Sequence, residues 1–336
     1  MGRMGLLGVR LAYLLTDLVV PVAQLGSGMF ITRHTKGRRA WRRVFLALAV
    51  AGLAAAGCSS PTTGPTPTSQ PGTGSGTTTA QPPSNLPRPD HVVVVVMENH
   101  GLDQIRSTSQ APYIDQLART GALFTSASAI AHPSQPNYLA LFSGDTHGLT
   151  NDSCPHSFSA PNLGERLLGA HLSFAGYSED LPSAGYTGCG AGGYARKHNP
   201  WVNFTNVPAA ANQSFATFGP NYAALPTVSI VVPNLCNDMH DCGVGTGDTW
   251  IKNKLDGFVK WAQTHNSLLV LTWDEAENAS ANNQIALILA GPMIKAGQYG
   301  EPVNHYRLLR TLEDMYHLAP TGQAGATSAI TDIWVH

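Results

Sequence analysis

The sequence predicts an α/β domain with a mostly parallel central sheet that is flanked by helices on both faces. The first observation is a run of five valines at residues 92–96, followed by Met97. A strand with one face in water alternates apolar and polar residues, so an unbroken apolar run indicates a strand buried on both faces, as in parallel sheets. The second observation is that strand-like and helix-like segments alternate along residues 90–336, the order that builds such layers.

Each element is predicted from its own pattern. Short runs rich in apolar and β-branched residues indicate strands, and longer runs with apolar residues three or four positions apart indicate helices. In the last predicted helix, Leu308, Leu312 and Met315 follow that spacing. The predicted strands are 91–97, 122–129, 172–177, 227–232, 267–273 and 284–290, and the predicted helices are 111–120, 135–143, 162–169, 248–264 and 304–317.

The charge balance excludes one class of partner. The formal net charge is -1 and 12% of the residues are charged, so the chain lacks the basic surface that binds nucleic acid. The hydrophobic content of 43% suits a globular enzyme.

Residues 1–58 are predicted to form an export signal. Residues 38–57 place basic side chains before an apolar run of signal-peptide length, and Arg42 and Arg43 resemble the twin-arginine export motif. The protein is therefore expected to leave the cytoplasm, as a cell-surface lipoprotein or as a secreted protein.

Residues 55–58 resemble a bacterial lipobox, in which Cys58 would be acylated and would anchor the protein to a membrane. Simple secretion is the alternative. A further apolar stretch at the start of the chain is explained if translation begins at Met29, so that residues 1–28 are not translated. The alternative for that stretch is an extra membrane helix.

Residues 59–89 are predicted to be a disordered tether, because Ser, Thr, Pro or Gly occupies 25 of the 31 positions. Such a composition cannot bury a core. Residues 90–336 then form the catalytic domain, which is long enough for one α/β unit with a substantial core.

The cysteines also suit an exported protein. If Cys58 carries lipid, Cys154, Cys189, Cys236 and Cys242 remain for an oxidising compartment. The sequence leaves three pairings open, but the short distance along the chain favours a bond between the last two. A zinc site is the alternative, although no pair has the usual two-residue spacing.

Side chains that offer oxygen ligands follow two predicted strands where these strands end. Glu98 and Asn99 follow the valine strand, and Asp274 and Glu275 follow the strand 267–273. The carboxyl ends of parallel strands meet at one edge of the sheet, where ligands bind in such folds. A polar turn that caps a buried strand is the alternative.

Further polar residues are expected at the same edge. Carboxylates gathered in one place repel each other unless a cation lies among them, so the sequence predicts a divalent metal site. The additional residues are Asp238, His240 and Asp241, in the loop after the strand 227–232, and His305, which opens the last helix.

Ser134 is the candidate nucleophile. It lies just before the predicted helix 135–143. Free backbone N–H groups and the helix dipole favour phosphate at such a position. An ordinary helix cap is the alternative role, and the nearby carboxylates favour catalysis.

Six blocks of the chain resemble the bacterial phosphoesterase family, which holds secreted acid phosphatases and phosphatidylcholine-hydrolysing phospholipases C within the alkaline phosphatase-like superfamily. The chain is most similar to the short mycobacterial-type secreted acid phosphatases that act on phosphatidylinositol 3-phosphate. The resemblance implies an alkaline phosphatase-like fold. The blocks are MENHGLDQI, HPSQPNYLALFSG, ARKHNPWVNF, DMHD, LTWDEAE and NHYRLLRTLEDMYHL.

The resemblance also implies roles for individual residues. Ser134 would attack phosphorus, and it would bind one divalent metal ion of unknown identity together with Glu98, Asn99, Asp274 and Glu275. A metal at this place would lower the pKa of the serine and stabilise charge on the phosphoryl oxygens. The residues expected to hold these oxygens and to protonate the leaving group are His198, His240 and His305, and additional site candidates are His132, Lys197 and Asp238.

A second metal ion is doubtful. Two-metal members of the superfamily carry an Asp and, four residues later, a His where this chain has Asn234 and Asp238. We therefore expect His240 and His305 to supply positive charge in place of a second ion.

Three functions compete. The first is an exported phosphomonoesterase, and the second is a phosphodiesterase or phospholipase C, whose long relatives carry extra C-terminal domains. The third is a non-catalytic binding lipoprotein, which would not need Ser134 beside two carboxylate-terminated strands. The sequence favours the first, with a phosphomonoester as the substrate.

Overall fold

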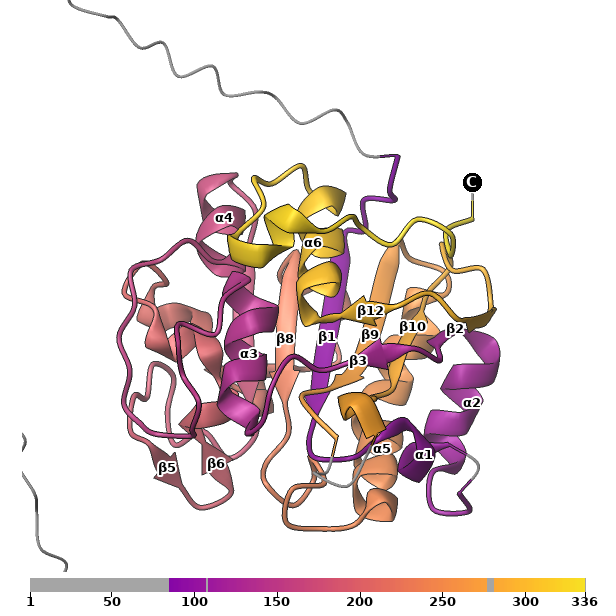
Figure 1. Cartoon of the computed structure of the whole chain (residues 1–336), viewed down its shortest axis with the longest axis horizontal. Helices are drawn as coiled ribbons and strands as arrows, with labels where there is room; N and C mark the ends of the chain where they lie inside the picture. Colours follow the sequence, from indigo (N-terminus) through magenta and orange to yellow (C-terminus); the bar gives the residue numbers. More distant parts are fainter. Residues whose placement is uncertain (1–84, 107, 277–280, 336) are drawn as a thin grey trace, which may run out of the picture. The chain divides into compact units, whose positions relative to one another are not determined.

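The computed structural model describes residues 85–335 except 107 and 277–280 (Figure 1). The predicted export signal with Cys58, and most of the predicted tether, lie outside the described residues. The end of the tether contacts the folded domain, because Leu86 packs against the core and the Pro89 carbonyl accepts a 3.0 Å hydrogen bond from the Tyr316 hydroxyl. The folded part therefore begins before residue 90.

The centre of the domain is an eight-stranded sheet in which β10 runs against its two neighbours and all other neighbouring pairs are parallel. This confirms the predicted mostly parallel sheet. The order of the strands is β11 (Gly297–Tyr299), β2 (Ala122–Phe124), β10 (Leu287–Ala290), β9 (Ser267–Trp273), β1 (His91–Met97), β8 (Val228–Val232), β4 (Phe174–Ser178) and β7 (Asn212–Ser214).

The valine run is the central strand, as predicted. Residues 92–96 of β1 are at most 1% exposed, because neighbouring strands and helices cover them on every side. β1 pairs with β9 along its whole length, so that Met97 lies opposite Trp273. The residues that follow these two therefore leave the sheet side by side.

Helices cover both faces of the sheet, which confirms the five predicted helices with shifted ends. α3 and α6 pack against each other in front of the sheet in Figure 1, whereas α2 packs against α5, which passes behind the strands. The helices are α1 (Leu102–Ile105), α2 (Pro112–Thr120), α3 (Ser134–Ser143), α4 (Leu163–Gly169), α5 (Val244–Ala262) and α6 (His305–Met315).

Short elements complete the domain. The small strands are β3 (Ala127–Ser128), which pairs with β12 (Val303–Asn304), and β5 (Gly190–Ala191), which pairs with β6 (Tyr194–Ala195). The 3₁₀ helices are η1 (Arg196–His198), η2 (Pro200–Asn203), η3 (Ala209–Ala211), η4 (Phe215–Thr217), η5 (Tyr222–Ala224), η6 (Ala281–Asn283) and η7 (Gly322–Ala326).

Two predicted elements differ from the structure. The predicted strand 122–129 is divided, because the chain turns after Phe124 and the second part pairs outside the main sheet. Helix α5 begins at Val244 rather than at 248, despite its early glycines. Gly247 lets the helix approach the preceding loop closely, because a Cβ atom there would lie 2.5 Å from the Met239 side chain.

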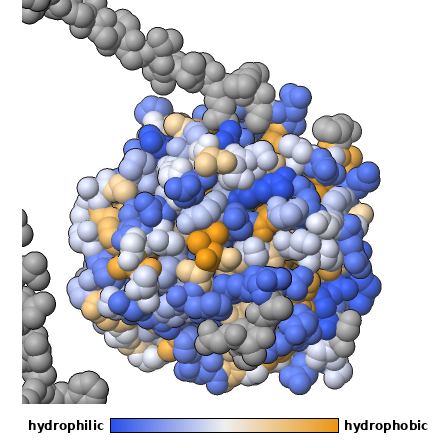
Figure 2. Space-filling view, viewed as in Figure 1, coloured by the Kyte–Doolittle hydropathy of each residue, from blue (hydrophilic) through white to orange (hydrophobic). Residues whose placement is uncertain are grey.

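The exterior shows little apolar surface. Val335 is the one exposed large hydrophobic side chain among the described residues. The face seen in Figure 2 is mostly hydrophilic, with separate small orange areas. Within the described part of the chain, no helix combines the length and the apolar character needed to cross a membrane.

Glu313 on α6 is a buried carboxyl group away from the strand ends. Its Oε1 accepts hydrogen bonds from Thr321 N at 2.9 Å and from Thr321 Oγ1 at 2.6 Å, whereas its Oε2 is buried without a hydrogen bond. Burial raises the pKa of Glu313 to about 7, although the hydrogen bonds from Thr321 act in the opposite direction.

The domain should therefore lose stability as the pH rises from 4.5 to about 7. In this window the unfolded chain has released the proton of Glu313 and the folded chain still holds it, so rising pH favours unfolding, by about 3 kcal/mol in total. Glu313→Gln should make this slope smaller in urea unfolding measured across the window, whereas Glu165→Gln, at a partly exposed site, should keep the wild-type slope. An equal slope in the Glu313 variant and the wild type would contradict the assignment.

Candidate active site

Ser134 opens α3, a helix whose ten residues are all buried. The chain before it is shaped by Asn137, whose Oδ1 accepts hydrogen bonds from Ile130 N and Ala131 N, each at 2.9 Å. The Asn137 amide also donates to the Pro133 carbonyl at 3.2 Å. One side chain of the helix thus fixes the direction from which Ser134 enters it.

The Ser134 hydroxyl lies between two buried carboxylates. Its Oγ is 3.0 Å from Glu98 Oε2 and 3.1 Å from Glu275 Oε1. Glu98 follows β1 and Glu275 follows β9 by one further residue, so the parallel pairing of these strands places both acceptors at the serine. A single hydroxyl proton is shared between two anions at this point.

Asp274 adds a third carboxylate. Its backbone N–H donates to Met97 O at 2.9 Å, and its Oδ1 accepts from Asn99 N at 3.1 Å. Burial, followed by the charges of Glu98 and Glu275, raises the pKa of Asp274 well above its ordinary value. Its Oδ2 is buried without a hydrogen bond among the described residues. The group therefore offers an unused oxygen in a negatively charged place.

His198 lies between Glu98 and Asp238 and is 1% exposed. Its Nε2 is 2.9 Å from Glu98 Oε1 and its Nδ1 is 3.3 Å from Asp238 Oδ2. Burial lowers the pKa of His198, but the two carboxylates outweigh it and raise the pKa to about 9. Burial likewise favours protonated Glu98, yet His198 brings the pKa of Glu98 down to about 2. The two groups form a charged pair at neutral pH.

His240 is held between Asp241 and Lys197. Its Nδ1 is 2.7 Å from Asp241 Oδ1, and its Nε2 is 3.3 Å from Lys197 Nζ. Because an ammonium group only donates, Nε2 accepts and the ring proton lies on Nδ1. Glu98, His198 and His240 offer ligand atoms that all lie within 4.8 Å of one another, so this group could hold a metal ion.

His132 and His305 complete the predicted set. His132 Nδ1 contacts Glu275 Oε2. His305 Nε2 donates to the Asp274 carbonyl at 2.6 Å, and burial lowers the pKa of His305 to about 4. The expected positive charge on His305 is therefore wrong for this structure, because its enclosed position favours the neutral ring.

The structure thus brings the residues predicted from separate blocks to one edge of the sheet. Asn99 takes part through its backbone, in a left-handed conformation with φ 60°. The side chains that meet there are those of Glu98, His132, Ser134, Lys197, His198, Asp238, His240, Asp274 and Glu275, and the His305 ring packs behind Asp274.

Two residues of the site were not predicted. The Tyr138 hydroxyl donates to Glu98 Oε1 at 2.7 Å, and its ring stacks on His198 with centroids 5.1 Å apart. Its spacing of four from Ser134 on one helix face could have indicated it. Asp152 Oδ1 accepts from Gln135 N at 2.9 Å, so the expected free N–H after the serine is occupied. No local pattern indicates Asp152.

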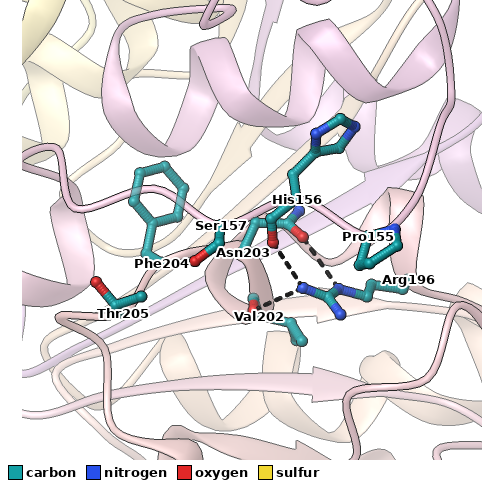
Figure 3. Close-up of a pocket in the computed structure, with 8 residues that line it drawn as sticks. All are labelled: Pro155, His156, Ser157, Arg196, Val202, Asn203, Phe204 and Thr205. Atoms are coloured by element: carbon teal, nitrogen blue, oxygen red, sulfur yellow. Dashed lines mark hydrogen bonds between the residues drawn. The ribbon is translucent and has the colours of Figure 1, made fainter.

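Arg196 anchors η1, the segment that carries Lys197 and His198. Its guanidinium donates to the carbonyls of His156 at 2.9 Å and Val202 at 3.2 Å (Figure 3). Figure 3 also shows its Nε bonded to the Asn203 side chain, at 3.0 Å. Arg196 forms part of the wall of a pocket of about 340 Å³. Because its guanidinium already donates to these three residues, we assign it a structural role rather than a role in binding a ligand.

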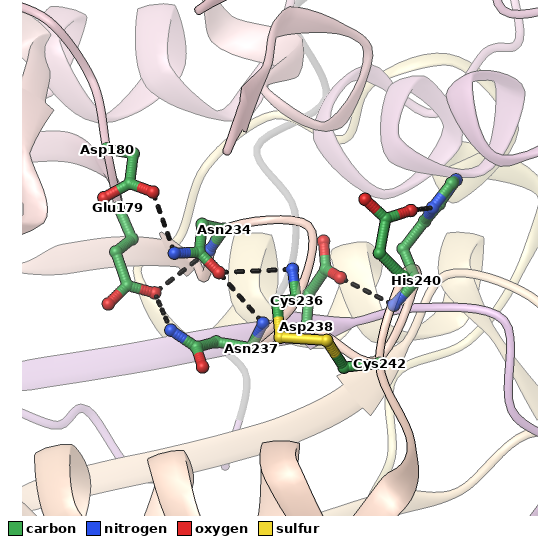
Figure 4. The surroundings of a disulfide bond; sticks show 9 residues. Glu179, Asp180, Asn234, Cys236, Asn237, Asp238, His240 and Cys242 are labelled. Carbon is green, nitrogen blue, oxygen red and sulfur yellow. Dashed lines mark hydrogen bonds and ion pairs between the residues drawn. A yellow bond between two sulfur atoms is a disulfide. The ribbon is translucent and has the colours of Figure 1, made fainter. Parts of the chain in front are cut away.

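The loop with Asp238 and His240 is closed by the disulfide Cys236–Cys242, as predicted, and Cys154 bonds to Cys189. Figure 4 shows that Glu179 and Asn234 hold this loop from outside. Asn234 Oδ1 accepts from Cys236 N at 3.2 Å and from Asn237 N at 2.9 Å, and Glu179 Oε2 accepts from Asn234 N at 3.1 Å. Asn234 therefore serves the loop rather than the carboxylate cluster.

Loss of the Cys236–Cys242 bond should lower kcat more, and the unfolding temperature less, than loss of the Cys154–Cys189 bond. The double variant Cys236→Ser/Cys242→Ser should lose roughly tenfold or more in kcat, since small displacements of site residues are costly. Chain entropy gives its short loop a smaller stabilisation, about 2.5 kcal/mol, than the roughly 4 kcal/mol of the longer Cys154–Cys189 loop.

The matched control is Cys154→Ser/Cys189→Ser, which should show the larger fall in unfolding temperature and the smaller fall in kcat. Thermal unfolding and turnover measured on both variants check the order. Free thiols at both Cys236 and Cys242 in exported protein would contradict the assignment.

Comparison with known proteins identifies the family of the chain. Residues 106–319 match the Phosphoesterase family. Phosphatidylinositol-3-phosphatase of Mycobacterium tuberculosis is 47% identical over 295 residues, which are 87% of this chain and 95% of that protein. Phosphate-repressible acid phosphatase of Penicillium chrysogenum is 33% identical over 230 residues, 62% of this chain and 55% of that protein, so the chain spans about half of its length.

A solved structure shows the same fold. A protein in the alkaline phosphatase superfamily from Vibrio parahaemolyticus aligns with a TM-score of 0.52 at 12% identity, over 69% of this chain and 68% of that one. The alkaline phosphatase-like fold expected from the sequence is therefore confirmed.

Proposed function

The chain belongs to the phosphoesterase family, and from this premise we propose that it is an exported phosphatase for phosphate monoesters, with phosphoinositide headgroups among its substrates. Its relatives are phosphatases by name, so the chain is a phosphoric ester hydrolase rather than a binding lipoprotein. The name of the mycobacterial relative supports the phosphoinositide substrate. Residues 38–57 and the two disulfides support export, to the cell surface if Cys58 is acylated.

One observation carries this proposal. The Ser134 hydroxyl is bonded to two buried carboxylates, Glu98 and Glu275, at the ends of paired strands. A helix cap would bond to backbone N–H groups instead, and α3 has no side-chain cap. Two anionic acceptors at a buried serine suit the removal of its proton, which nucleophilic attack requires.

We infer that a divalent metal ion binds beside this serine. Asp274 Oδ2 is buried without a hydrogen bond, and three carboxylates meet there. When bound, the ion would lower the pKa of the serine hydroxyl and withdraw charge from the phosphoryl oxygens. An all-oxygen set suits a hard cation such as Mg²⁺, Ca²⁺ or Mn²⁺. The residues that would hold it are Glu98, Ser134, Asp274 and Glu275, whereas Asn99, the fifth predicted ligand, donates its backbone N–H to Asp274 Oδ1.

The group Glu98, His198 and His240 is a second set of ligands that shares Glu98 with the first. Among the described residues, this is the group of acidic and histidine side chains whose ligand atoms all lie within 4.8 Å of one another. We nevertheless prefer the oxygen set, because Ser134 Oγ contacts Glu98 and Glu275 and the His240 lone pair faces Lys197. A second ion at this place stays doubtful for the same reason.

Each step of the proposed phosphoryl transfer can be assigned to particular groups of the site or to water. Ser134 Oγ forms a bond to phosphorus while the bond from phosphorus to the alcohol oxygen breaks, and the serine proton has Glu98 and Glu275 as its acceptors. The departing oxygen needs a proton, which solvent water can give, because the ring proton of His240 lies on Nδ1 against Asp241 and its Nε2 accepts from Lys197. Water then attacks phosphorus, the bond to Oγ breaks, and phosphate leaves.

The test compares a monoester with a diester. Purified protein should hydrolyse p-nitrophenyl phosphate much faster than bis(p-nitrophenyl) phosphate, and it should release phosphate from vesicles that contain phosphatidylinositol 3-phosphate. A higher kcat/KM for phosphatidylcholine cleavage than for any monoester would replace the proposal with a phospholipase C.

A further inference from the structure

Lys197 is a cationic side chain at the edge of the carboxylate cluster whose charge the reaction above does not use. Its Nζ lies 2.9 Å from Asp152 Oδ2 and 3.3 Å from His240 Nε2. An ammonium group has three donors, so one remains beyond these two contacts. Its side chain is 21% exposed, which leaves the group open toward an incoming ligand.

Asp152 ties Lys197 to the helix that presents the nucleophile. Its Oδ2 accepts from Lys197 and its Oδ1 accepts from Gln135 N at 2.9 Å, and Gln135 directly follows Ser134. The ammonium group is therefore held in a fixed relation to the start of α3. On its other side, Arg196 fixes the backbone from which Lys197 extends.

The Lys197 ammonium group lies where a second metal ion bound to His240 Nε2 would lie. The His240 lone pair, which would bind such an ion, faces the ammonium group. One divalent ion among three carboxylates leaves little positive charge for a substrate. A phosphate monoester dianion brings two negative charges and a diester brings one, so a further cation favours the monoester.

We propose that Lys197 is a phosphate-binding residue that selects monoester dianions over diesters, and that Asp152 is its positioning residue. The inference rests on the proposed function, since it concerns the same site. It assigns to Lys197 the positive charge that was expected from His305.

The experiment measures kcat/KM for p-nitrophenyl phosphate and bis(p-nitrophenyl) phosphate in the full enzyme and its variants. Lys197→Met should lose about a hundredfold on the monoester, the loss typical for one electrostatic donor, and much less on the diester. Lys197→Arg keeps the charge and should recover most of the monoester preference. Lys254→Met, which changes an exposed lysine on α5, should behave like the wild type.

Asp152→Asn keeps an acceptor for Gln135 N and removes the anion that holds Lys197. It should raise KM for the monoester and raise the inhibition constant of inorganic phosphate, with a smaller change in kcat. If Asp152 only stabilised the fold, KM and the inhibition constant of phosphate would not rise together while kcat changed little. The variant also tests the idea if Lys197→Met does not fold.

Three outcomes would overturn the inference. The first is an unchanged monoester preference in Lys197→Met, and the second is an equal loss on both substrates. The third is two metal ions per chain in the active enzyme, with no effect of Asp152→Asn on phosphate inhibition. A wild-type protein without monoesterase activity would instead refute the proposed function, so the two failures are distinguishable.

Discussion

Ser134→Ala is expected to lose at least about a thousandfold in kcat, a loss of ~4 kcal/mol in transition-state stabilisation. The reason is that the Ser134 hydroxyl is the group on which the buried acceptors Glu98 and Glu275 converge. Without it, the phosphoserine intermediate cannot form, and hydrolysis would depend on direct attack by water.

The fold should not explain this loss. Ser134→Ala removes no backbone hydrogen bond, because the partners of Ser134 Oγ are both side chains. Helix α3 remains buried on all sides. Ser143→Ala, at the other end of the same helix, is the matched control, because Ser143 Oγ bonds to Leu139 O at 2.8 Å and lies outside the carboxylate cluster. The control should turn over at nearly the wild-type rate.

Two measurements check the role of Ser134. Acid-quenched wild-type enzyme should carry phosphate on the peptide that contains Ser134, as seen by mass spectrometry, and the alanine variant should not. Circular dichroism should be the same for both. Turnover by Ser134→Ala near the wild-type rate would show that another group attacks phosphorus.

The architecture could be predicted because a strand that is buried on both faces of a sheet has a nearly continuous apolar sequence. Residues 92–97 of β1 and 268–271 of β9 are buried apolar runs, and the carboxylates Glu98 and Asp274 directly follow the two strands. Once both are taken as parallel strands, their ends must meet. The structure adds that Met97 and Trp273 lie directly opposite each other, which no local pattern specifies.

The rest of the site depends on contacts between distant parts of the chain. Asp152 approaches Lys197 across 45 positions, and Glu179 approaches Asn237 across 58, in segments without regular periodicity. Their sequences look like ordinary polar loops. The charge of a buried histidine could not be predicted from the sequence either. His198 and His305 are both buried, but carboxylates lie beside the His198 ring only, so their pKa values shift in opposite directions.

Removal of the metal should abolish activity and also weaken the fold. Glu98, Asp274 and Glu275 meet in a buried place, and their mutual repulsion opposes folding unless a cation offsets it. Metal at a thousandfold excess over its Kd stabilises a folded protein by about 4 kcal/mol. Exhaustive dialysis against EDTA should therefore lower both activity and Tm, and added divalent metal should restore both.

Asp274→Asn should act in opposite directions on activity and on metal-free stability. It replaces a carboxylate that would bind the metal, so kcat/KM should fall by more than a hundredfold, roughly 3 kcal/mol. It also removes a buried negative charge beside Glu98 and Glu275, so at neutral pH the dialysed variant should unfold at a higher temperature than the dialysed wild type. Added metal should raise the Tm of the wild type and leave that of Asp274→Asn nearly unchanged. Full activity of the variant, or an equal response of both proteins to metal, would show that Asp274 is not a ligand and that the cation lies elsewhere.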